Sequence, residues 1–206
     1  PDGFRRLVDS STALVTVIHA QNEIGTLQPV ADISAIAKHH GALVHADAAQ
    51  SVGKVPVSVE TLGVDLLSIA GHKLYAPKGV GALYVRHGLD IPSVLAGAGQ
   101  EHGRRPGTEN VAFIVALGEA CRTAAADLEN NGKQMKLAAD ALLSRLKADV
   151  PGIVLTGHTG QRLPNTLNVL FPGVSGRKLL ALCPQVFASN GSACHADREE
   201  ASAILT

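Results

Sequence analysis

The stretch of this chain that indicates most about its fold reads Ser68-Ile69-Ala70-Gly71-His72-Lys73-Leu74-Tyr75-Ala76-Pro77-Lys78-Gly79. The apolar segment before it, 64–69, is typical of a buried strand, so Lys73 is expected where a strand ends and a loop begins. A lysine held there among apolar neighbours is a candidate for forming a Schiff base, because burial favours the uncharged, nucleophilic amine. The alternative is an ordinary solvated loop lysine.

A second polar residue follows an apolar run earlier in the chain. Asp47 lies in His45-Ala46-Asp47-Ala48-Ala49-Gln50. A lysine that forms a Schiff base and an aspartate that holds a pyridinium nitrogen are the two residues with which proteins typically bind pyridoxal 5'-phosphate. Short motifs also occur by chance, so Asp47 taken alone is equally an ordinary turn residue. Asp47 and Lys73 together predict a pyridoxal phosphate site.

Five motifs occur in a fixed order along the chain: His19–Thr26, His45–Lys54, Ala70–Lys73, Gly99–Asn110 and Ser192–Cys194. Together they resemble the cysteine desulfurase and selenocysteine lyase family, which are fold-type I pyridoxal phosphate enzymes of the class V aminotransferase superfamily. The resemblance extends over nearly the whole chain, and an ordered set of motifs is far more specific than any one of them.

The resemblance implies a role for each matching residue. Lys73 would be catalytic, binding the cofactor and then moving protons at the substrate α-carbon. Asp47 would hold the ring nitrogen, Gln50 the phenolic oxygen, and His72 the phosphate. Asn22 would lie near the phenolic oxygen and the substrate carboxylate. Local alternatives remain for two of them, because Gln50 also suits a helix start and Asn22 a turn at a strand end.

Thr108 matches a family threonine that reaches the phosphate of the neighbouring subunit's cofactor. The resemblance therefore implies a homodimer with shared active sites. Thr108 equally suits the N-cap of a helix that begins at Glu109. At Ala70 the chain departs from the family, which often has a serine there. One hydroxyl donor is thus absent, so phosphate binding is either weaker or uses another donor.

Cys194 lies among small residues, which indicates a flexible loop, and His195 beside it would favour the reactive thiolate. The resemblance implies that Cys194 is the second catalytic residue. It would attack the sulfur or selenium of L-cysteine or L-selenocysteine, release alanine, and pass the sulfur to an acceptor protein, as in iron–sulfur cluster assembly. Cys121 and Cys183 are expected to be buried structural thiols.

The order of elements predicts an α/β protein. Strands are expected at 13–20, 42–46, 66–70 and 80–86, and a helix is expected to begin at Pro29. Strands that alternate with helices and are apolar on both faces indicate a mostly parallel central sheet flanked by helices. This is the architecture of fold type I, which the resemblance also implies.

The pattern changes after this sheet. Helices are expected at 109–130, 133–150 and 177–182, and strands at 166–171 and 186–189. Asn130-Asn131-Gly132 is expected to break the helical stretch. We therefore expect a large, partial pyridoxal phosphate-binding domain over residues 1–130 and a partial small α+β domain over residues 131–206.

The amino-acid composition limits which kinds of binding partner and which cellular compartment are expected for this protein. Charges balance at 18 basic and 18 acidic residues, and aromatic residues are 3% with no Trp, so nucleic acid and membranes are not expected as partners. Three cysteines do not make a disulfide framework, which favours a reducing, cytoplasmic setting. Both ends look cut: the resemblance implies an upstream phosphate-binding turn and ring-stacking histidine, and a downstream arginine for the substrate carboxylate.

Two other classes remain as alternatives. A metal-dependent hydrolase is suggested by nine histidines and by His45 and Asp47 on one strand face, but no close third ligand or His-Glu-x-x-His motif accompanies them, so no metal is expected. A non-catalytic fragment is the other alternative. Within the family, Ser192–Asp197 resembles loops of both branches, and desulfurase is preferred because it is the broader class.

Overall fold

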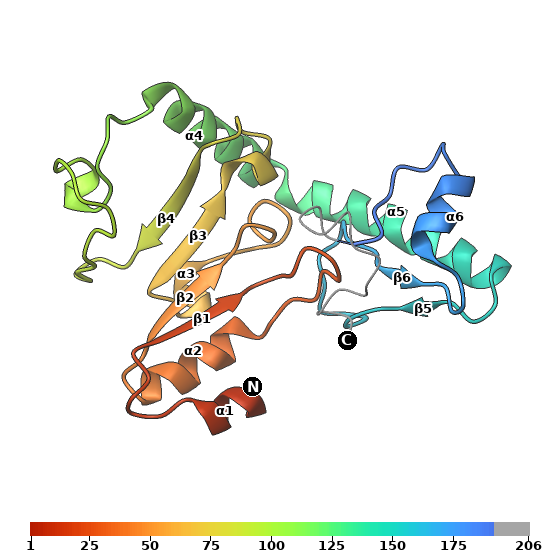
Figure 1. The fold of residues 1–206 in the computed structure, drawn as a ribbon, viewed down its shortest axis with the longest axis horizontal. Helices are drawn as coiled ribbons and strands as arrows, with labels where there is room; N and C mark the ends of the chain where they lie inside the picture. The colour runs from red at the N-terminus through yellow and green to blue at the C-terminus, as the bar shows by residue number, and fades with distance from the viewer. Residues whose placement is uncertain (192–206) are drawn as a thin grey trace. The chain divides into compact units, whose positions relative to one another are not determined.

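The computed structural model describes residues 1–191, which fall into two compact units (Figure 1). The first unit contains residues 1–19 and 29–128. The second contains residues 20–28 together with the chain from residue 129 onward. Residues 20–28 thus pack with the C-terminal part of the chain, although they lie between the first strand and the first long helix in sequence.

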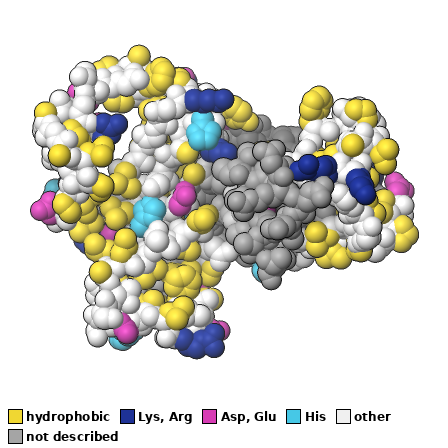
Figure 2. Space-filling model, in the orientation of Figure 1, with side chains coloured by type: hydrophobic (Ala, Val, Ile, Leu, Met, Phe, Trp, Pro, Cys, Tyr) yellow, Lys and Arg dark blue, Asp and Glu magenta, His cyan; other side chains and the backbone are white. Residues whose placement is uncertain are grey.

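Charged groups are spread over the surface. On the face shown in Figure 2, Lys and Arg side chains are interspersed with Asp and Glu, and hydrophobic and uncharged surface lies between them. This agrees with the balance of 18 basic and 18 acidic residues in the sequence. Among the helices of residues 1–191, none combines the length and the apolar character that crossing a membrane requires.

The first unit is built on a four-stranded sheet with the order β1-β2-β3-β4. Its strands are β1 (Leu14–Ile18), β2 (Leu43–Asp47), β3 (Leu66–Ala70) and β4 (Gly81–Val85). β1, β2 and β3 run parallel, whereas β4 is antiparallel to β3, so the prediction of a mostly parallel sheet is confirmed. The register places Asp47 opposite both Ile18 and Ser68.

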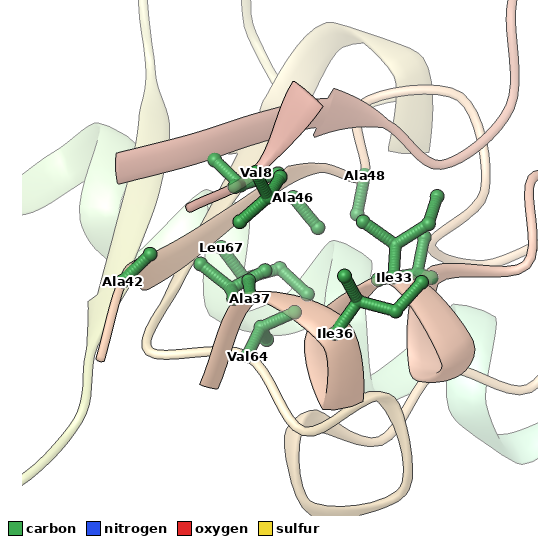
Figure 3. Packing of buried hydrophobic residues seen from close by; sticks show 12 residues of the cluster. Val8, Ile33, Ile36, Ala37, Ala42, Ala46, Ala48, Val64 and Leu67 are labelled. Carbon is green, nitrogen blue, oxygen red and sulfur yellow. The ribbon is translucent and has the colours of Figure 1, made fainter. Parts of the chain in front are cut away.

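Helix α2 packs on strands β1 and β2 of this sheet and supplies four residues of the buried core, Val30, Ile33, Ile36 and Ala37. The helices of the unit are α1 (Asp2–Leu7), α2 (Val30–His39), α3 (Val59–Leu62), η1 (Gly71–Leu74), η2 (Glu101–Gly103) and α4 (Val111–Ala126). Figure 3 shows Ile33 and Ile36 of α2 packed with Ala46 and Ala48 in one buried cluster. Each large aliphatic side chain buried there stabilises the fold by roughly 1.5–3 kcal/mol.

Asp65 fixes the start of β3 against its neighbours. Its side chain is only 2% exposed, and Oδ2 accepts from the Val44 amide at 2.8 Å while Oδ1 accepts from Arg86 Nε at 2.7 Å. The Asp65 amide also donates to the Val44 carbonyl at 2.9 Å. A buried carboxylate is stable when it is paired and hydrogen-bonded in this way. The network therefore helps to set the register that positions the ends of β2 and β3.

The second unit combines helices with a two-stranded antiparallel sheet. Its elements are α5 (Leu128–Asp149), β5 (Val154–Leu155), β6 (Val169–Leu170) and α6 (Gly176–Leu182). Arg162 ties residues 20–28 to this unit, because its Nη2 donates to the carbonyls of Ile24 and Thr166 at 3.2 and 3.0 Å. Asn168 Nδ2 adds a hydrogen bond to the Glu23 carbonyl at 3.3 Å.

Several predicted elements differ from those observed. The helical stretch breaks at Asp127 rather than at residues 130–132, which lie within α5. The strand expected at 186–189 is wrong, since those residues have no regular structure, and the one expected at 166–171 shortens to β6. Elements α1, α3 and β5 were not predicted. Short segments carry too little periodicity to be recognised.

Candidate functional site

The candidate site begins at the carboxyl ends of two neighbouring parallel strands. Asp47 ends β2 and is partly buried, and its Oδ1 accepts from the Ala49 amide at 2.9 Å. Its main-chain carbonyl accepts from the His19 amide at 2.9 Å. Oδ1 of Asp47 is thus hydrogen-bonded within the turn after β2, and this bond fixes the orientation of the carboxylate and of its other oxygen, Oδ2.

Lys73 lies in η1, the short helix that begins directly after β3. The prediction that Lys73 is held among apolar neighbours is wrong for the described chain, because Lys73 and His72 are both exposed while Gly71 and Leu74 are buried. The reason is geometric. In a 3₁₀-helix residues three apart share a face, so burying Gly71 and Leu74 turns the residues between them outward.

Backbone geometry holds this turn in place. A Cβ on Gly71 would lie 2.6 Å from the Val80 carbonyl oxygen, which accepts from the Gly71 amide at 3.0 Å. No other residue fits this close approach. Tyr75 ends the turn in the left-handed conformation, with φ of 66°, and its side chain is fully exposed. Positive φ at a non-glycine residue is a strained conformation that is frequent at functional sites.

Leu74 anchors the turn on the segment that follows Asp47. Gly53 has φ of +76°, and a Cβ there would clash with Leu74 Cδ2 and lie 3.2 Å from Ala124 Cβ of α4. The absence of a side chain at Gly53 therefore lets Leu74 pack closely. This contact brings the turn that carries Lys73 against residues 48–54, which carry Gln50.

Residues 48–54 form a compact turn with a buried polar pair. The Ser51 hydroxyl lies 3.3 Å from the Ala48 carbonyl and 2.9 Å from His19 Nδ1. The Ser51 hydroxyl and His19 Nδ1 thus form a hydrogen bond inside the core, since both residues are buried. Burial lowers the pKa of His19 from its ordinary value, which favours the neutral ring. His19 thus supports the turn from the core.

Gln50 and Lys54 complete this turn. Lys54 Nζ donates to the Gln50 carbonyl at 2.9 Å, so the lysine closes the turn over four residues of main chain. Both side chains are partly buried. Burial lowers the pKa of Lys54, and repulsion from the charge on Lys73 lowers it further. Lys54 is the last residue of the motif His45–Lys54, and its hydrogen bond within the turn was not predicted.

His45 belongs to a chain of hydrogen bonds across three strands that was not predicted from the sequence. Its Nδ1 lies 2.7 Å from Thr16 Oγ1 and its Nε2 lies 2.8 Å from Ser68 Oγ. Both ring nitrogens are therefore used by hydroxyls, which does not suit a metal ligand. Within residues 1–191, no group of three or more His, Cys, Asp or Glu side chains is arranged to hold a metal ion.

Three other predicted site residues, Asn22, Thr108 and Cys194, are not part of this cluster of turns as the structure describes it. Thr108 is exposed, and the N-cap of α4 is Asn110, whose Oδ1 accepts from the Phe113 amide at 3.3 Å, so the interpretation of Thr108 as the cap is wrong. Asn22 belongs to the second unit, where its Oδ1 accepts from Gln21 Nε2 at 3.3 Å. Cys194 falls outside the described residues.

Cys121 and Cys183 are only partly buried, so the expectation that both are buried thiols is wrong.

The side chains gathered in the first unit fit pyridoxal phosphate by their chemistry. An exposed amine at Lys73 suits an aldehyde, and a carboxylate at Asp47 suits a protonated ring nitrogen. An imidazole at His72 can donate to a phosphate oxygen, and an amide at Gln50 can donate to a phenolic oxygen. Both segments follow adjacent parallel strands, which is where open α/β sheets bind their ligands.

Comparisons with known proteins identify the family of this chain. Residues 1–203 match the family model described as aminotransferase class-V. The chain is 43% identical over 208 residues to cysteine desulfurase IscS of Methanosarcina thermophila, covering 100% of this chain and 51% of that protein. It is 40% identical over 204 residues to cysteine desulfurase NifS of Azotobacter vinelandii, covering 98% and 51%.

A solved structure titled as a NifS-like protein superposes with a TM-score of 0.85 at 38% identity, covering 96% of this chain and 56% of that one. The chain therefore spans about half the length of the relatives it matches.

Proposed function

This chain belongs to the aminotransferase class-V family, and we propose that the full-length protein is a pyridoxal phosphate-dependent cysteine desulfurase. Enzymes of this family and the cysteine desulfurases among them depend on pyridoxal phosphate. The observation that carries the proposal is the placement of Lys73 and Asp47. They follow adjacent parallel strands, and the turns that contain them are packed together by Leu74 and Gly53.

Each side chain of the site has a task in this reaction. Asp47 holds the protonated ring nitrogen, Gln50 orients the phenolic oxygen, and His72 donates to the phosphate. When bound, the cofactor supplies an electron sink for the substrate α-carbon. Lys73 then takes a proton from that carbon or returns it, because a freed amine is an effective general base and acid. Asn22 is proposed to contact the phenolic oxygen and the substrate carboxylate.

Cys194 is proposed to carry the sulfur. Its thiolate attacks the sulfur of L-cysteine, so that an S–S bond forms and the bond between the substrate's Cβ and sulfur breaks. The electron pair of that bond stays with the carbon, which gains a proton and leaves as L-alanine. The persulfide then passes its terminal sulfur to an acceptor protein, for example in iron–sulfur cluster assembly.

The assembly and setting of the protein are also proposals. We propose a homodimer in which Thr108 reaches the neighbouring site, which is supported by the exposure of Thr108 in the segment before α4. The balanced surface charge supports a protein without nucleic acid or membrane partners, and the sparse cysteines support a cytoplasmic location. Residues 1–130 and 131–206 are proposed as parts of the large and small domains.

The test is the release of alanine by the full-length protein from L-cysteine, with pyridoxal phosphate added. We expect turnover that is lost in Lys73→Ala and kept in Lys78→Ala, an exposed lysine of the same loop. A protein that retains cofactor but releases no alanine from cysteine would overturn the proposal. Release from selenocysteine alone would instead assign the protein to the selenocysteine lyase branch.

A further inference from the structure

Asn22 lies in a turn whose main chain is hydrogen-bonded from within. Gln21 Oε1 accepts from the Glu23 amide at 2.7 Å and from the Ile24 amide at 3.0 Å. The Gln21 carbonyl accepts from the Gly25 amide at 2.9 Å, which closes the turn. Asn22 is exposed, whereas Gly25 is buried. The turn therefore presents the side chain of Asn22 while its own main chain is fixed.

The same turn is also held from outside, by residues 162–168 of the second unit. The three consecutive carbonyls of residues 23–25 each accept a hydrogen bond from this stretch. Their donors are, in order, Asn168 Nδ2 at 3.3 Å, Arg162 Nη2 at 3.2 Å and the Leu163 amide at 2.8 Å. The contact is close, because a Cβ on Gly25 would lie 2.7 Å from Thr166 Cβ.

Arg162 joins this turn to other parts of the second unit. Its Nη2 also donates to the Thr166 carbonyl at 3.0 Å, and its Nη1 donates to the carbonyls of Thr156 and His158 at 3.4 and 3.5 Å. Among the ion pairs found within residues 1–191, none includes Arg162. Its partly buried guanidinium therefore serves the main chain, and the rigid fork of five N–H groups suits that task.

We propose that Arg162 is a positioning residue for Asn22: by holding the Ile24 carbonyl it fixes the turn from which Asn22 meets the carboxylate of the substrate. This inference deepens the proposed function, because it rests on the role proposed there for Asn22.

The argument is one of preorganisation. A side chain binds a substrate more tightly when its main chain is already fixed, because less conformational freedom is lost on binding. Without Arg162, partly buried carbonyls lose a charged donor, which is costly, and the turn opens more often. The Leu163 amide and Asn168 still hold the neighbouring carbonyls, so the change should stay local.

The first arm of the test measures amide hydrogen exchange in the cofactor-free, full-length protein by mass spectrometry. In Arg162→Met, exchange in peptides that cover residues 21–27 is expected to rise by about 10-fold or more, because local opening becomes easier. Peptides that cover β2 should be unchanged. Arg145→Met is the matched control, an exposed arginine of α5 in the same unit, and should leave both sets of peptides unchanged.

The second arm measures KM for L-cysteine at saturating cofactor. Arg162→Met should raise KM by about 3- to 10-fold, since a misplaced Asn22 binds the substrate carboxylate less well. In the Asn22→Ala background, the same substitution should raise KM by less than about twofold, because two residues that act through one contact are not additive. Arg145→Met should leave KM unchanged in both backgrounds.

Thermal melts monitor folding, and Arg162→Lys is the variant to use if Arg162→Met does not fold. It keeps the positive charge but loses the planar fork, so exchange over residues 21–27 should still rise, by about threefold. Unchanged exchange there in a folded variant at position 162 overturns the inference.

An equal rise over residues 21–27 and over β2 also overturns the inference, since it would indicate a general loss of stability. So does an equal increase in KM with and without Asn22. The first arm is read without cofactor or turnover. A protein that releases no alanine from cysteine overturns the proposed function and the substrate role with it, whereas unchanged exchange overturns this inference alone.

Discussion

At the scale of single residues, Asp47 is the residue proposed to hold the protonated ring nitrogen of the cofactor. In Asp47→Asn the amide oxygen can still accept from the Ala49 amide, so the turn after β2 should form. The neutral side chain no longer favours a protonated ring nitrogen. We expect alanine release from cysteine at saturating cofactor to fall by about 10²-fold or more, as for other preorganised electrostatic contacts.

Asp9→Asn is the control, because Asp9 is exposed and its carboxylate accepts from the amide and the hydroxyl of Ser11 in its own turn. It should leave turnover unchanged. Near wild-type turnover in Asp47→Asn would contradict the role assigned to Asp47.

Cys194 is expected to be the one cysteine that carries transferred sulfur. After the full-length protein reacts with L-cysteine, alkylation without reductant and peptide mapping should find persulfide at Cys194 and not at Cys121 or Cys183, both partly buried. Cys194→Ala should still take up cofactor but fail to pass sulfur to an acceptor. Transfer at the normal rate in that variant would refute the mechanism.

The lowered pKa of the buried His19 predicts how the free energy of unfolding depends on pH. Burial depresses its pKa in the folded chain below the ordinary 6.5, so below that pH the unfolded chain binds a proton that the folded chain does not. Stability is therefore full above pH 6.5 and falls as the pH is lowered through and below it. Urea unfolding from pH 7.5 to 5 should show this slope in wild type and in His87→Gln, an exposed control, and a weaker slope in His19→Gln. Equal slopes in wild type and His19→Gln would contradict this assignment.

The positions of Asp47 and Lys73 in the fold were easier to predict than their surroundings. Motif order placed Asp47 and Lys73 at strand ends, and the structure has them there. It did not predict that Lys73 is exposed, because which face of a one-turn helix is buried depends on its partners, here Val80 and Gly53. The hydrogen bond between Ser68 and His45 was missed for a similar reason, since it joins two strands that are distant in sequence.

At the scale of elements, the contact between Leu74 and Gly53 positions the turn that carries Lys73. Gly53→Ala adds backbone strain of about 1–2 kcal/mol at positive φ and overpacking of about 1–3 kcal/mol against Leu74. Gly41→Ala is a matched control, with φ of +79° but open space around its Cβ, so it should show the strain alone.

The free energy of unfolding in urea measures both variants, and borohydride trapping at Lys73 should be weakened only in Gly53→Ala. Equal destabilisation of Gly53→Ala and Gly41→Ala would show that Leu74 does not pack closely against position 53.

Helices and strands were predicted best where they are long and where their apolar residues follow a clear pattern. Residues 66–70 were predicted as a strand with the bounds that β3 has, because an apolar run precedes a clear glycine signal. The helix break was misplaced because Asn and Gly disfavour helix only by up to about 1 kcal/mol each. Within α5 the ion pair of Lys133 with Glu129, at 2.6 Å and spaced one turn apart, acts against that cost.

At the scale of the whole molecule, two compact units are built from an interleaved chain. Residues 20–28 leave the sheet after β1, pack with the C-terminal unit through Arg162 and Asn168, and return to α2. A domain boundary predicted from sequence is a single position along the chain. The packing of residues 20–28 with the second unit could not be predicted in this way, because the hydrogen bonds of this segment join residues more than a hundred positions apart.

The central claim is that Lys73 is the residue that bonds the aldehyde of pyridoxal phosphate. The full-length protein, loaded with cofactor, is reduced with borohydride, digested and mapped by mass spectrometry. We predict a pyridoxyl label on Lys73, retained in Lys78→Met and absent in Lys73→Met. A label on another lysine, Lys54 included, or no label on a protein that retains cofactor, would contradict the account.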